Sequence, residues 1–350
     1  MESSSGKVIP LANGRVERLL TTLRSKKRLV VLTHDNPDPD SIASAMGLAY
    51  IAVAKVKIKC DIAYGGYIGR AENRAMIRHL RIDMLHASRI DWDDYDAVGL
   101  VDTQPGAKNH SLPPGRKATV VIDHHPIREE TKQAEFADVG GDYGATTTKV
   151  VEYLRALNLP IDETLGTALF YGIKSDTRDL GRESNAADFA AYRYLFDRAD
   201  LPMVSEIEHP QVPREYFHAM VTGFRKARVY ESAVVANLGD IYTPDLCAEI
   251  SDRLLQADGI KWSLAIGIYA DQLYCSIRTR DKRRNAGKLI AEVITERGMA
   301  GGHGSMAGAR QPLLGQGTRS RRATVQQVIK RFLKALDIED GNDGEPLYES

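Results

Sequence analysis

The stretch R-L-V-V-L-T-H-D-N-P-D-P-D, residues 28–40, carries both the fold and the chemistry expected of this 350-residue chain. Its first six residues form a strand-length run that stops at His34, and three aspartates follow within six positions. The small residues after them predict a helix over residues 41–56. Because ligands of an open α/β sheet bind at the carboxyl ends of its strands, these acids stand where a ligand site is expected.

Short apolar runs alternate with amphipathic segments up to about residue 200. Strands are predicted over residues 28–33, 57–64, 96–101 and 118–122, and helices over 41–56, 72–80, 147–157, 163–174 and 186–199. Apolar runs that are separated by helices are typical of a parallel sheet that is buried on both faces. We therefore predict an α/β domain over residues 1–200, with a parallel sheet and helices on both of its faces.

Three prolines in L-P-M-V-S-E-I-E-H-P-Q-V-P, residues 201–213, mark a boundary between domains. Beyond it, the pattern predicts strands over 227–237, 263–269 and 272–278, and helices over 245–256, 286–297 and 325–336. We expect a linker over residues 201–225, a smaller α+β domain over 226–337 and an acidic disordered tail over 338–350. A cleft between the two domains is expected to hold the substrate.

Net charge, cysteine content and the absence of long apolar runs indicate which partners and which compartment to expect. Lysine and arginine together number 47, as do aspartate and glutamate, so we expect no broad basic field and no binding of long duplex nucleic acid. Cys60, Cys247 and Cys275 are too few and too far apart for a disulfide framework or a zinc site, which suits a reducing cytoplasm. The start, M-E-S-S-S-G-K, lacks a signal-peptide core, and no 18 consecutive apolar residues occur. We expect a cytoplasmic protein that does not engage a membrane.

Three predicted strands end in acids or histidines. These are His34, Asp38 and Asp40 after the first strand, Asp102 after the strand over 96–101, and Asp123, His124 and His125 after the strand over 118–122. A single strand-end aspartate is usually a helix cap or a turn former, and a lone histidine is usually structural. Carboxylates from three strand ends would instead repel one another unless cations lay between them, so the set predicts bound metal.

The spacing around the first strand end suits a metal site beside an anion site. Pro37 and Pro39 stiffen the turn, so that Asp38 and Asp40 lie on one side of it while Asp35 faces away. The helix that follows favours an anion at its N-terminus. Histidine and aspartate without thiolate favour two manganese ions, with magnesium or cobalt as alternatives. The chemistry expected is hydrolysis of a phosphoester by a bridging water that both ions activate.

The motifs H-D-N-P-D-P-D-S-I-A-S, V-D-T-Q-P and V-I-D-H-H-P resemble, in order and spacing, those of the DHH phosphoesterase superfamily. The resemblance extends over about residues 14–315 and is strongest for the branch that combines oligoribonuclease with 3'-phosphoadenosine 5'-phosphate phosphatase activity. The stretch G-I-K-S-D-T, residues 172–177, looks like the family's fourth metal-binding motif. The stretch G-G-H-G-S-M-A-G, residues 301–308, looks like the glycine-rich signature of the DHH-associated C-terminal domain.

The resemblance implies a role for each residue of these motifs. One ion would be held by His34, Asp38 and Asp102, and the second by Asp40, Asp102, His124 and Asp176. His125 would contact the scissile phosphate or assist the leaving group, and Asp123 would orient the two histidines. Substrate would be bound by Asn36 and, in the C-terminal domain, by Arg278, Gly301, Gly302 and His303, where the glycines let backbone approach a ligand closely.

Two departures from the family pattern bear on substrate choice. Arg178 stands where relatives usually continue the fourth motif with glycine, and it could clash, re-shape the pocket or bind a substrate phosphate. Met306 replaces a customary alanine, and only two glycines precede His303. Neither change touches an expected metal ligand.

The function expected is hydrolysis of short nucleotides: short oligoribonucleotides, dinucleotides or 3'-phosphoadenosine 5'-phosphate. The same residues would serve a phosphodiesterase of cyclic or linear signalling dinucleotides, which the sequence leaves open. Pyrophosphatase activity ranks lower, because the class II inorganic pyrophosphatases that share the metal motifs have a C-terminal domain without the G-G-H signature. A non-catalytic nucleotide-binding module would be expected to have lost ligands, and every expected position is filled here. Similar proteins commonly dimerise through the N-terminal domain, so a homodimer fits the resemblance, although no interface can be identified.

Overall fold

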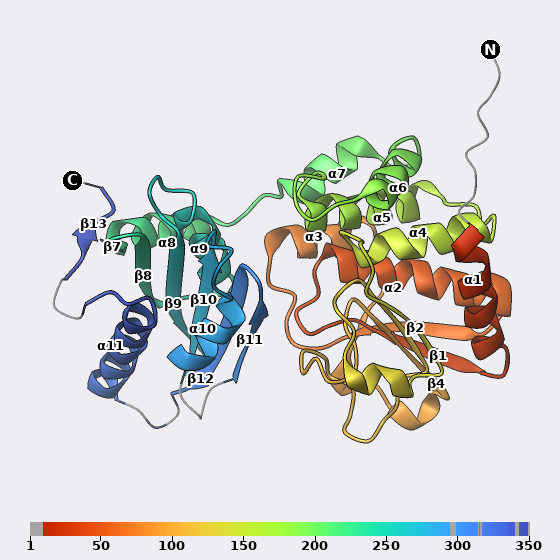
Figure 1. Cartoon of the computed structure of the whole chain (residues 1–350), viewed down its shortest axis with the longest axis horizontal. Coiled ribbons are helices and arrows are strands. Elements are labelled where there is room, and N and C mark those ends of the chain that lie inside the picture. The colour runs from red at the N-terminus through yellow and green to blue at the C-terminus, as the bar shows by residue number, and fades with distance from the viewer. Residues whose placement is uncertain (1–9, 295–298, 314, 316, 340–342, 349–350) are drawn as a thin grey trace, which may run out of the picture. The chain divides into compact units, whose positions relative to one another are not determined.

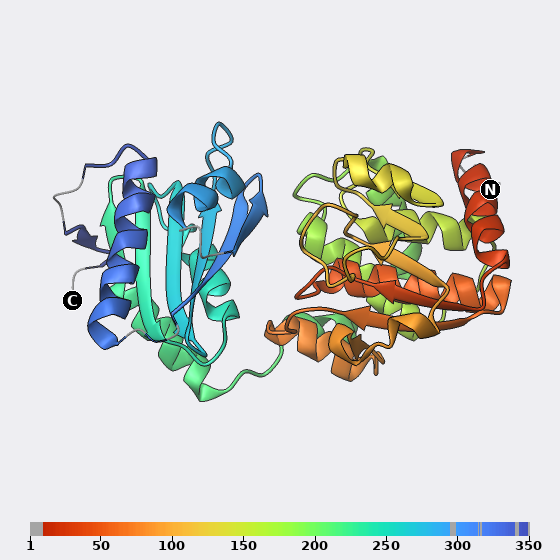
Figure 2. The same cartoon turned by 90° about the horizontal axis from the view of Figure 1, so that it is seen from below.

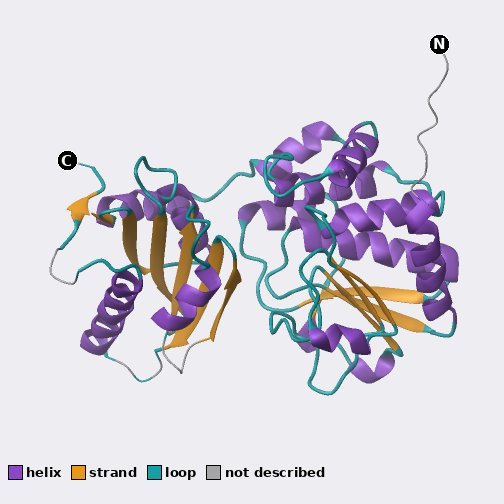
Figure 3. Ribbon diagram, in the orientation of Figure 1, coloured by secondary structure: helices purple, strands orange, loops and turns teal. Residues whose placement is uncertain are grey.

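The computed structural model describes residues 10–294, 299–313, 315, 317–339 and 343–348, with the side chains of residues 10–13 and 303 excluded. The chain divides into two compact units, unit 1 over Met1–Gln211 and unit 2 over Val212–Ser350. Each has a sheet of its own, as Figures 1 and 3 show. No described helix is long and apolar enough to cross a lipid bilayer.

Unit 1 is built on a six-stranded sheet in which every pair is parallel, as predicted. Its strands are β1 Arg28–Leu32, β2 Lys59–Tyr64, β3 Leu85–His86, β4 Ala97–Val101, β5 Val120–Asp123 and β6 Phe136–Val139. They lie in the order β3-β2-β1-β4-β5-β6. Successive strands are thus added from β1 to β3 on one side of the sheet and from β4 to β6 on the other. The carboxyl ends of these two central strands form the topological switch point, where α/β sheets bind ligands.

The two faces of this sheet are covered differently. The longer helices are α1 Pro10–Arg24, α2 Pro39–Ile51, α3 Ala71–His79, α4 Thr146–Ala156, α5 Glu163–Thr177, α6 Ala186–Phe196 and α7 Leu201–Glu208, and α2 continues as a π-helix over Ala52–Val56. The larger core joins one sheet face to side chains of α1, α2, α4 and α5. The other face packs on segments that include short 3₁₀-helices, Ala87–Arg89 and Trp92–Asp94. Figure 2 shows these layers from a second side.

Unit 2 is an α+β unit around a mixed seven-stranded sheet. Its strands are β7 Arg228–Tyr230, β8 Ala233–Asp240, β9 Trp262–Tyr269, β10 Gln272–Thr279, β11 Met299–His303, β12 Met306–Pro312 and β13 Glu345–Pro346. Its helices are α8 Arg214–Lys226, α9 Asp245–Leu254, α10 Ala286–Val293 and α11 Thr318–Ala335. Only the pair β8 and β9 is parallel among the described strands. Helices α8 and α9 pack on one face, and α10 and α11 on the other.

The stretch 201–225, expected as a linker, is largely helical, and the units divide inside it, between Gln211 and Val212. Helix α7 packs into unit 1 because Val204 and Ile207, one turn apart, are buried in its core. The expected strand over 227–237 is two antiparallel strands, β7 and β8, because the chain turns at Glu231, whose φ is 53°.

The stretch 338–350, expected as a disordered tail, contains strand β13, which pairs with β7. The physical reason is an apolar anchor at the end of an otherwise acidic stretch: Leu347 packs against the core on the α8 side of the sheet. Its amide also donates to the carbonyl of Ala227 at 3.2 Å. Residues 340–342, 349 and 350 lie outside the described part of the chain.

Candidate metal centre

The histidine and aspartate side chains of the predicted site meet at the switch point of unit 1. Two groups of three, His34 with Asp38 and Asp102, and Asp40 with His124 and Asp176, each place their ligand atoms within 4.8 Å of one another. The first is the set that the resemblance implied for one ion, and the second, with Asp102 beside it, contains the four residues implied for the other. That they bind metal stays a prediction.

The first group surrounds the Nε2 atom of His34. This nitrogen lies 3.5 Å from Asp38 Oδ1 and 3.5 Å from Asp102 Oδ2. The other ring nitrogen, Nδ1, lies 2.9 Å from the carbonyl of Asp35. A carbonyl accepts only from a protonated nitrogen, so this contact assigns the proton to Nδ1 and leaves the Nε2 lone pair for a cation in the neutral ring.

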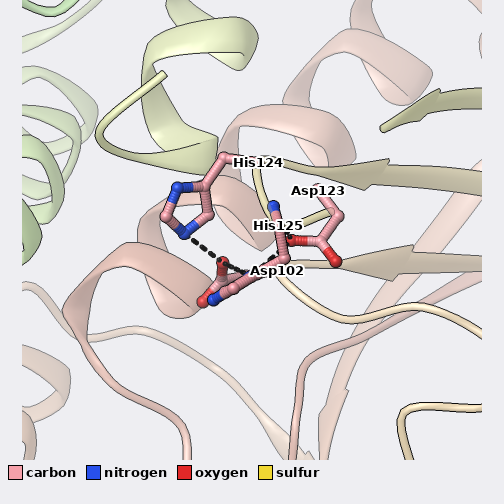
Figure 4. Close-up of side chains that lie close together, drawn as sticks. All are labelled: Asp102, Asp123, His124 and His125. Atoms are coloured by element: carbon pink, nitrogen blue, oxygen red, sulfur yellow. Dashed lines mark hydrogen bonds and ion pairs between the residues drawn. The ribbon is translucent and has the colours of Figure 1, made fainter. Parts of the chain in front are cut away.

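The second group repeats this arrangement around His124. Its Nε2 lies 3.6 Å from Asp102 Oδ1 and 3.5 Å from Asp176 Oδ2, while Nδ1 lies 3.1 Å from the carbonyl of Tyr143. Asp102 therefore turns one carboxylate oxygen toward each histidine. Figure 4 shows its contact with His124. This geometry suits a carboxylate shared by two ions.

Asp102 is held in an uncommon backbone conformation. Its φ is 56°, in the left-handed region that aspartate and asparagine tolerate better than other side chains. Its amide donates to Ile122 on β5 at 3.0 Å, and its Oδ1 accepts from the hydroxyl of Thr146 at 2.9 Å. Backbone in such a conformation persists where its surroundings fix it, which is frequent at functional sites.

Asp40 is fully buried, and the first turn of α4 holds its carboxylate. The amides of Thr146 and Thr147 each donate to one of its oxygens at 2.8 Å. The Thr147 hydroxyl donates to the Asp40 carbonyl at 3.1 Å. The chain thus uses the free amides at a helix N-terminus to orient a ligand carboxylate.

Asp102, Asp123, His124 and His125 form a further group whose ligand atoms lie within 4.8 Å of one another. Within this group, the Asp123 carboxylate contacts His125. Its Oδ1 accepts from the amide of His125 at 3.1 Å and lies 2.8 Å from His125 Nδ1 (Figure 4). Its Oδ2 accepts from Nε2 of Gln104 at 2.8 Å. Burial opposes a charge on His125, but Asp123 and Asp102 outweigh it and raise the pKa of His125 to about 9. The resemblance implied that Asp123 orients both histidines; its hydrogen bonds here are to His125, and the orienting role stays a prediction.

Carboxylates are crowded together at this centre. Burial and the carboxylates of Asp102, Asp176 and Asp38 hold the pKa of Asp40 well above its ordinary value. Burial, Asp38 and Asp102 raise the pKa of Asp176 to about 6. Burial opposes a charge on His34, yet Asp38 and Asp102 hold its pKa well above the ordinary value.

The residues fit divalent cations. Buried carboxylates whose pKa values rise because of one another are stabilised when positive charge is placed among them. Two imidazole nitrogens and four carboxylates, with no thiolate, suit manganese or magnesium better than a soft metal.

Two residues of the first motif lie beside the centre. Asp35 accepts from the Ser111 hydroxyl at 2.7 Å and belongs to neither triad, in line with the expectation that it faces away. Asn36 is exposed, has a φ of 59°, and accepts from the Tyr67 amide at 2.8 Å. Its Oδ1 thus ties the loop after β2 to the metal-binding loop, and substrate binding by Asn36 stays a prediction.

The residues predicted to bind substrate in unit 2 have structural partners. Arg278 is buried, and its Nε donates to Asp252 at 2.7 Å while Nη1 donates to the Ser276 hydroxyl at 2.7 Å. Gly302 has a φ of 151°, and a Cβ there would lie 2.4 Å from Ala307 Cα. The glycines were expected to let the backbone approach a ligand closely, but at Gly302 the close approach is to the neighbouring strand β12.

The two other residues predicted to bind substrate in unit 2 are Gly301 and His303. Gly301 is exposed on β11 with open space around it, and the side chain of His303 lies outside the described residues. Substrate binding by these residues is untested.

Sequence reasoning missed three groups of supporting residues. Gln104 donates to Asp123, and the Thr146 hydroxyl donates to Asp102. The amides of Thr146 and Thr147 donate to Asp40. Arg182 lies beside Asp176. The sequence carries a weak signal for the first two: Gln104 belongs to V-D-T-Q-P, and T-T-T at 146–148 opens a predicted helix. Arg182 has no local signal.

Comparison with known proteins agrees with this fold. Residues 28–173 match the model of the DHH family, N-terminal domain. The match covers less than half of the chain, and over this stretch the chain is similar to the DHH family.

Relatives extend the similarity to most of the chain. An uncharacterized protein of Methanocaldococcus jannaschii is 35% identical over 327 residues, which are 93% of this chain and 66% of that protein. The cyclic-di-AMP phosphodiesterase GdpP of Bacillus subtilis is 24% identical over 327 residues, 88% of this chain and 47% of GdpP. The chain thus spans about two thirds and about half of these relatives.

A solved structure shows the same fold. The exopolyphosphatase-related protein from Bacteroides fragilis matches with a TM-score of 0.73 at 16% identity, covering 94% of this chain and 99% of that chain.

Proposed function

We propose that this chain is a metal-dependent phosphoesterase that hydrolyses short nucleotides. The observation that carries the proposal is the pair of His and Asp groups that meet at the Asp102 carboxylate, at the switch point of a parallel sheet. Two divalent ions, with manganese as the first choice, would be held by His34, Asp38 and Asp102, and by Asp40, Asp102, His124 and Asp176. Bound there, they would supply Lewis-acid polarisation of a phosphoryl oxygen and lower the pKa of a water.

The protein's own residues would orient the reacting groups. Hydrolysis forms a bond from the water oxygen to phosphorus and breaks the bond from phosphorus to the leaving oxygen, which then needs a proton. His125 is suited to that role because Asp123 fixes its Nδ1 side and its side chain is one third exposed (33%). Its Nε2 would donate the proton to the leaving oxygen.

Short nucleotides are the preferred substrate class for two reasons. Residues 261–334 contain fifteen Lys and Arg against four Asp and Glu, so the zero net charge of the chain conceals a basic segment that suits phosphate groups. GdpP, a similar protein, is a phosphodiesterase of a cyclic dinucleotide. That similarity favours a second candidate, hydrolysis of a cyclic dinucleotide, over pyrophosphatase activity.

The test is a turnover panel on the full chain with manganese. Its substrates are cyclic-di-AMP, linear dinucleotides, 3'-phosphoadenosine 5'-phosphate, five- and twenty-nucleotide RNA, and pyrophosphate. Turnover that is confined to the short nucleotides and lost with a chelator supports the proposal, and cleavage of the cyclic compound alone selects the second candidate. Turnover of pyrophosphate alone, or of none, refutes it.

Two variants make the panel specific for the site. Asp102→Asn keeps the side-chain shape and tolerates the positive φ but removes the shared charge, so it should abolish turnover. Asp35→Asn changes an aspartate of the same motif that belongs to neither triad, so it should leave turnover close to that of the wild type.

A further inference from the structure

Arg182 brings a guanidinium to the edge of the second triad. Its Nη2 lies 3.6 Å from Asp176 Oδ1. Its Nε is buried and has no hydrogen-bond partner among the described residues. A guanidinium that only neutralised Asp176 would be expected to hydrogen-bond it at about 2.7–2.9 Å. The observed separation is longer, so the donor capacity of Arg182 toward this site is not filled by Asp176.

The loop that carries Arg182 has an unusual backbone. Four residues other than glycine adopt positive φ within six positions: Arg178 at 49°, Asp179 at 54°, Leu180 at 63° and Glu183 at 42°. Residues of these types are disfavoured there, so the surrounding contacts must hold the loop in this conformation.

Those contacts join the loop to the end of α5, directly after the ligand Asp176. The amide of Arg182 donates to the Thr177 carbonyl at 2.8 Å, and the amide of Leu180 donates to the Thr177 hydroxyl at 3.1 Å. Asp179 accepts from Lys174 at 2.8 Å. These contacts hold the backbone of Arg182 next to the end of α5, beside the triad.

Arg178, the cation that interrupts the family motif, has a different position. It caps α5 with a left-handed backbone conformation, at the position where the resemblance led us to expect glycine, and its side chain is exposed. Of the two arginines in D-T-R-D-L-G-R, only Arg182 makes an ion pair with a ligand of the predicted centre among the described residues.

We propose that Arg182 binds a phosphoryl oxygen of the substrate at the second triad. This inference rests on the proposed function and adds a phosphate-binding residue to it. The planar fork of arginine matches phosphate oxygens, and an oxygen placed at the triad would accept from the donors that Asp176 leaves unfilled. Arg182 thereby selects substrates that present a phosphate dianion or diester to the ions.

The test measures binding of inorganic phosphate and of manganese separately, by calorimetry on the full chain. Arg182→Met should weaken phosphate binding to the manganese-loaded protein by about 10-fold or more, the loss expected for a charged hydrogen bond. Manganese binding should stay unchanged or tighten, because a cation beside Asp176 has been removed. Arg182→Lys should restore part of the phosphate affinity, and Arg178→Met, the matched control, should change neither quantity.

Three results would overturn the inference: phosphate binding that Arg182→Met leaves unchanged, a loss of phosphate binding matched by an equal loss of manganese binding, or no phosphate binding by the loaded wild type. The proposed function can fail separately. If the wild type turns over nothing in the panel while Arg182→Met still weakens phosphate binding, the phosphate site stands and the phosphoesterase proposal falls. If turnover is present and phosphate binding does not respond, Arg182 alone is misassigned.

Discussion

Replacing Gln104 with methionine should destabilise unit 1 and lower turnover together. Gln104 is buried and uses its whole amide: Nε2 donates to Asp123 at 2.8 Å and to the Pro126 carbonyl at 3.1 Å. Its Oε1 accepts from the Arg128 amide and the Thr131 hydroxyl, both at 2.8 Å. Methionine has a similar length, so the change removes these four bonds with little loss of volume.

The size of the effect follows from the kinds of bond. A hydrogen bond to a charged group contributes about 1.5–3 kcal/mol and a neutral one about 1 kcal/mol, so the four total about 4–6 kcal/mol. Relaxation around the site recovers part of this, which leaves an expected loss of about 3–5 kcal/mol in the free energy of unfolding. Turnover should fall as well, because Asp123 would lose one of the partners that hold it against His125.

The assay is urea unfolding followed by tryptophan fluorescence. The chain has two tryptophans, Trp92 in unit 1 and Trp262 in unit 2, so a Trp262→Phe background reports on unit 1 alone. Gln133→Met is the matched control, because Gln133 is exposed in the same unit and its replacement should change stability by about 0.5 kcal/mol or less. A loss below about 1 kcal/mol for Gln104→Met would refute the reasoning.

Three further predictions concern other parts of the chain. Gly172→Ala would place a Cβ 2.8 Å from Thr147 Oγ1 and 2.9 Å from Ala43 Cβ, so the urea midpoint should fall by an amount equivalent to about 1–3 kcal/mol; an unchanged midpoint would show that α5 can shift freely. Manganese affinity should fall as the pH drops through 6, since Asp176, with a pKa of about 6, must lose its proton to bind a cation. Calorimetry in two buffers of different ionisation enthalpy should show proton release at pH 6, and a pH-independent affinity would speak against Asp176 as a ligand. Arg278→Met should lower the free energy of unfolding of unit 2 by about 1–3 kcal/mol, because it breaks the 2.7 Å contact with Asp252. The loss would be measured by the fluorescence of Trp262 in a Trp92→Phe background. A higher Michaelis constant at unchanged stability would instead assign Arg278 to substrate binding.

Three of the predicted ligands could be located from the sequence because each follows a recognisable strand, whereas Asp176 lies inside α5 and was expected only from the resemblance. His34, Asp102 and His124 come just after apolar runs, and a parallel sheet brings the carboxyl ends of its strands to one edge. The residues that hold these ligands could not be located in this way. Thr146 donates to Asp40, 106 positions earlier in the chain, and no local pattern encodes such a contact.

Two of the strands that sequence analysis did not predict, β3 and β12, are short or weakly patterned. Strand β3 has two residues and β12, M-A-G-A-R-Q-P, is rich in small residues, so neither has an apolar run of strand length. Prolines at 202, 210 and 213 indicated a linker. In the structure, Pro202 instead lies in the first turn of α7, where the missing amide hydrogen costs nothing, and Pro213 caps α8.

The central claim, two ions that share Asp102, is tested most directly by the number of manganese ions bound per chain. The metal-depleted full chain and its variants would be titrated by calorimetry, with circular dichroism as the check on folding. We predict two ions for the wild type and for Asp35→Asn. In folded Asp102→Asn, at least one ion should bind about 10-fold or more weakly, since even loss of a ligand's supporting partner costs that much. A wild type that binds no manganese, or an Asp102→Asn variant that binds two ions as tightly as the wild type, would contradict the assignment.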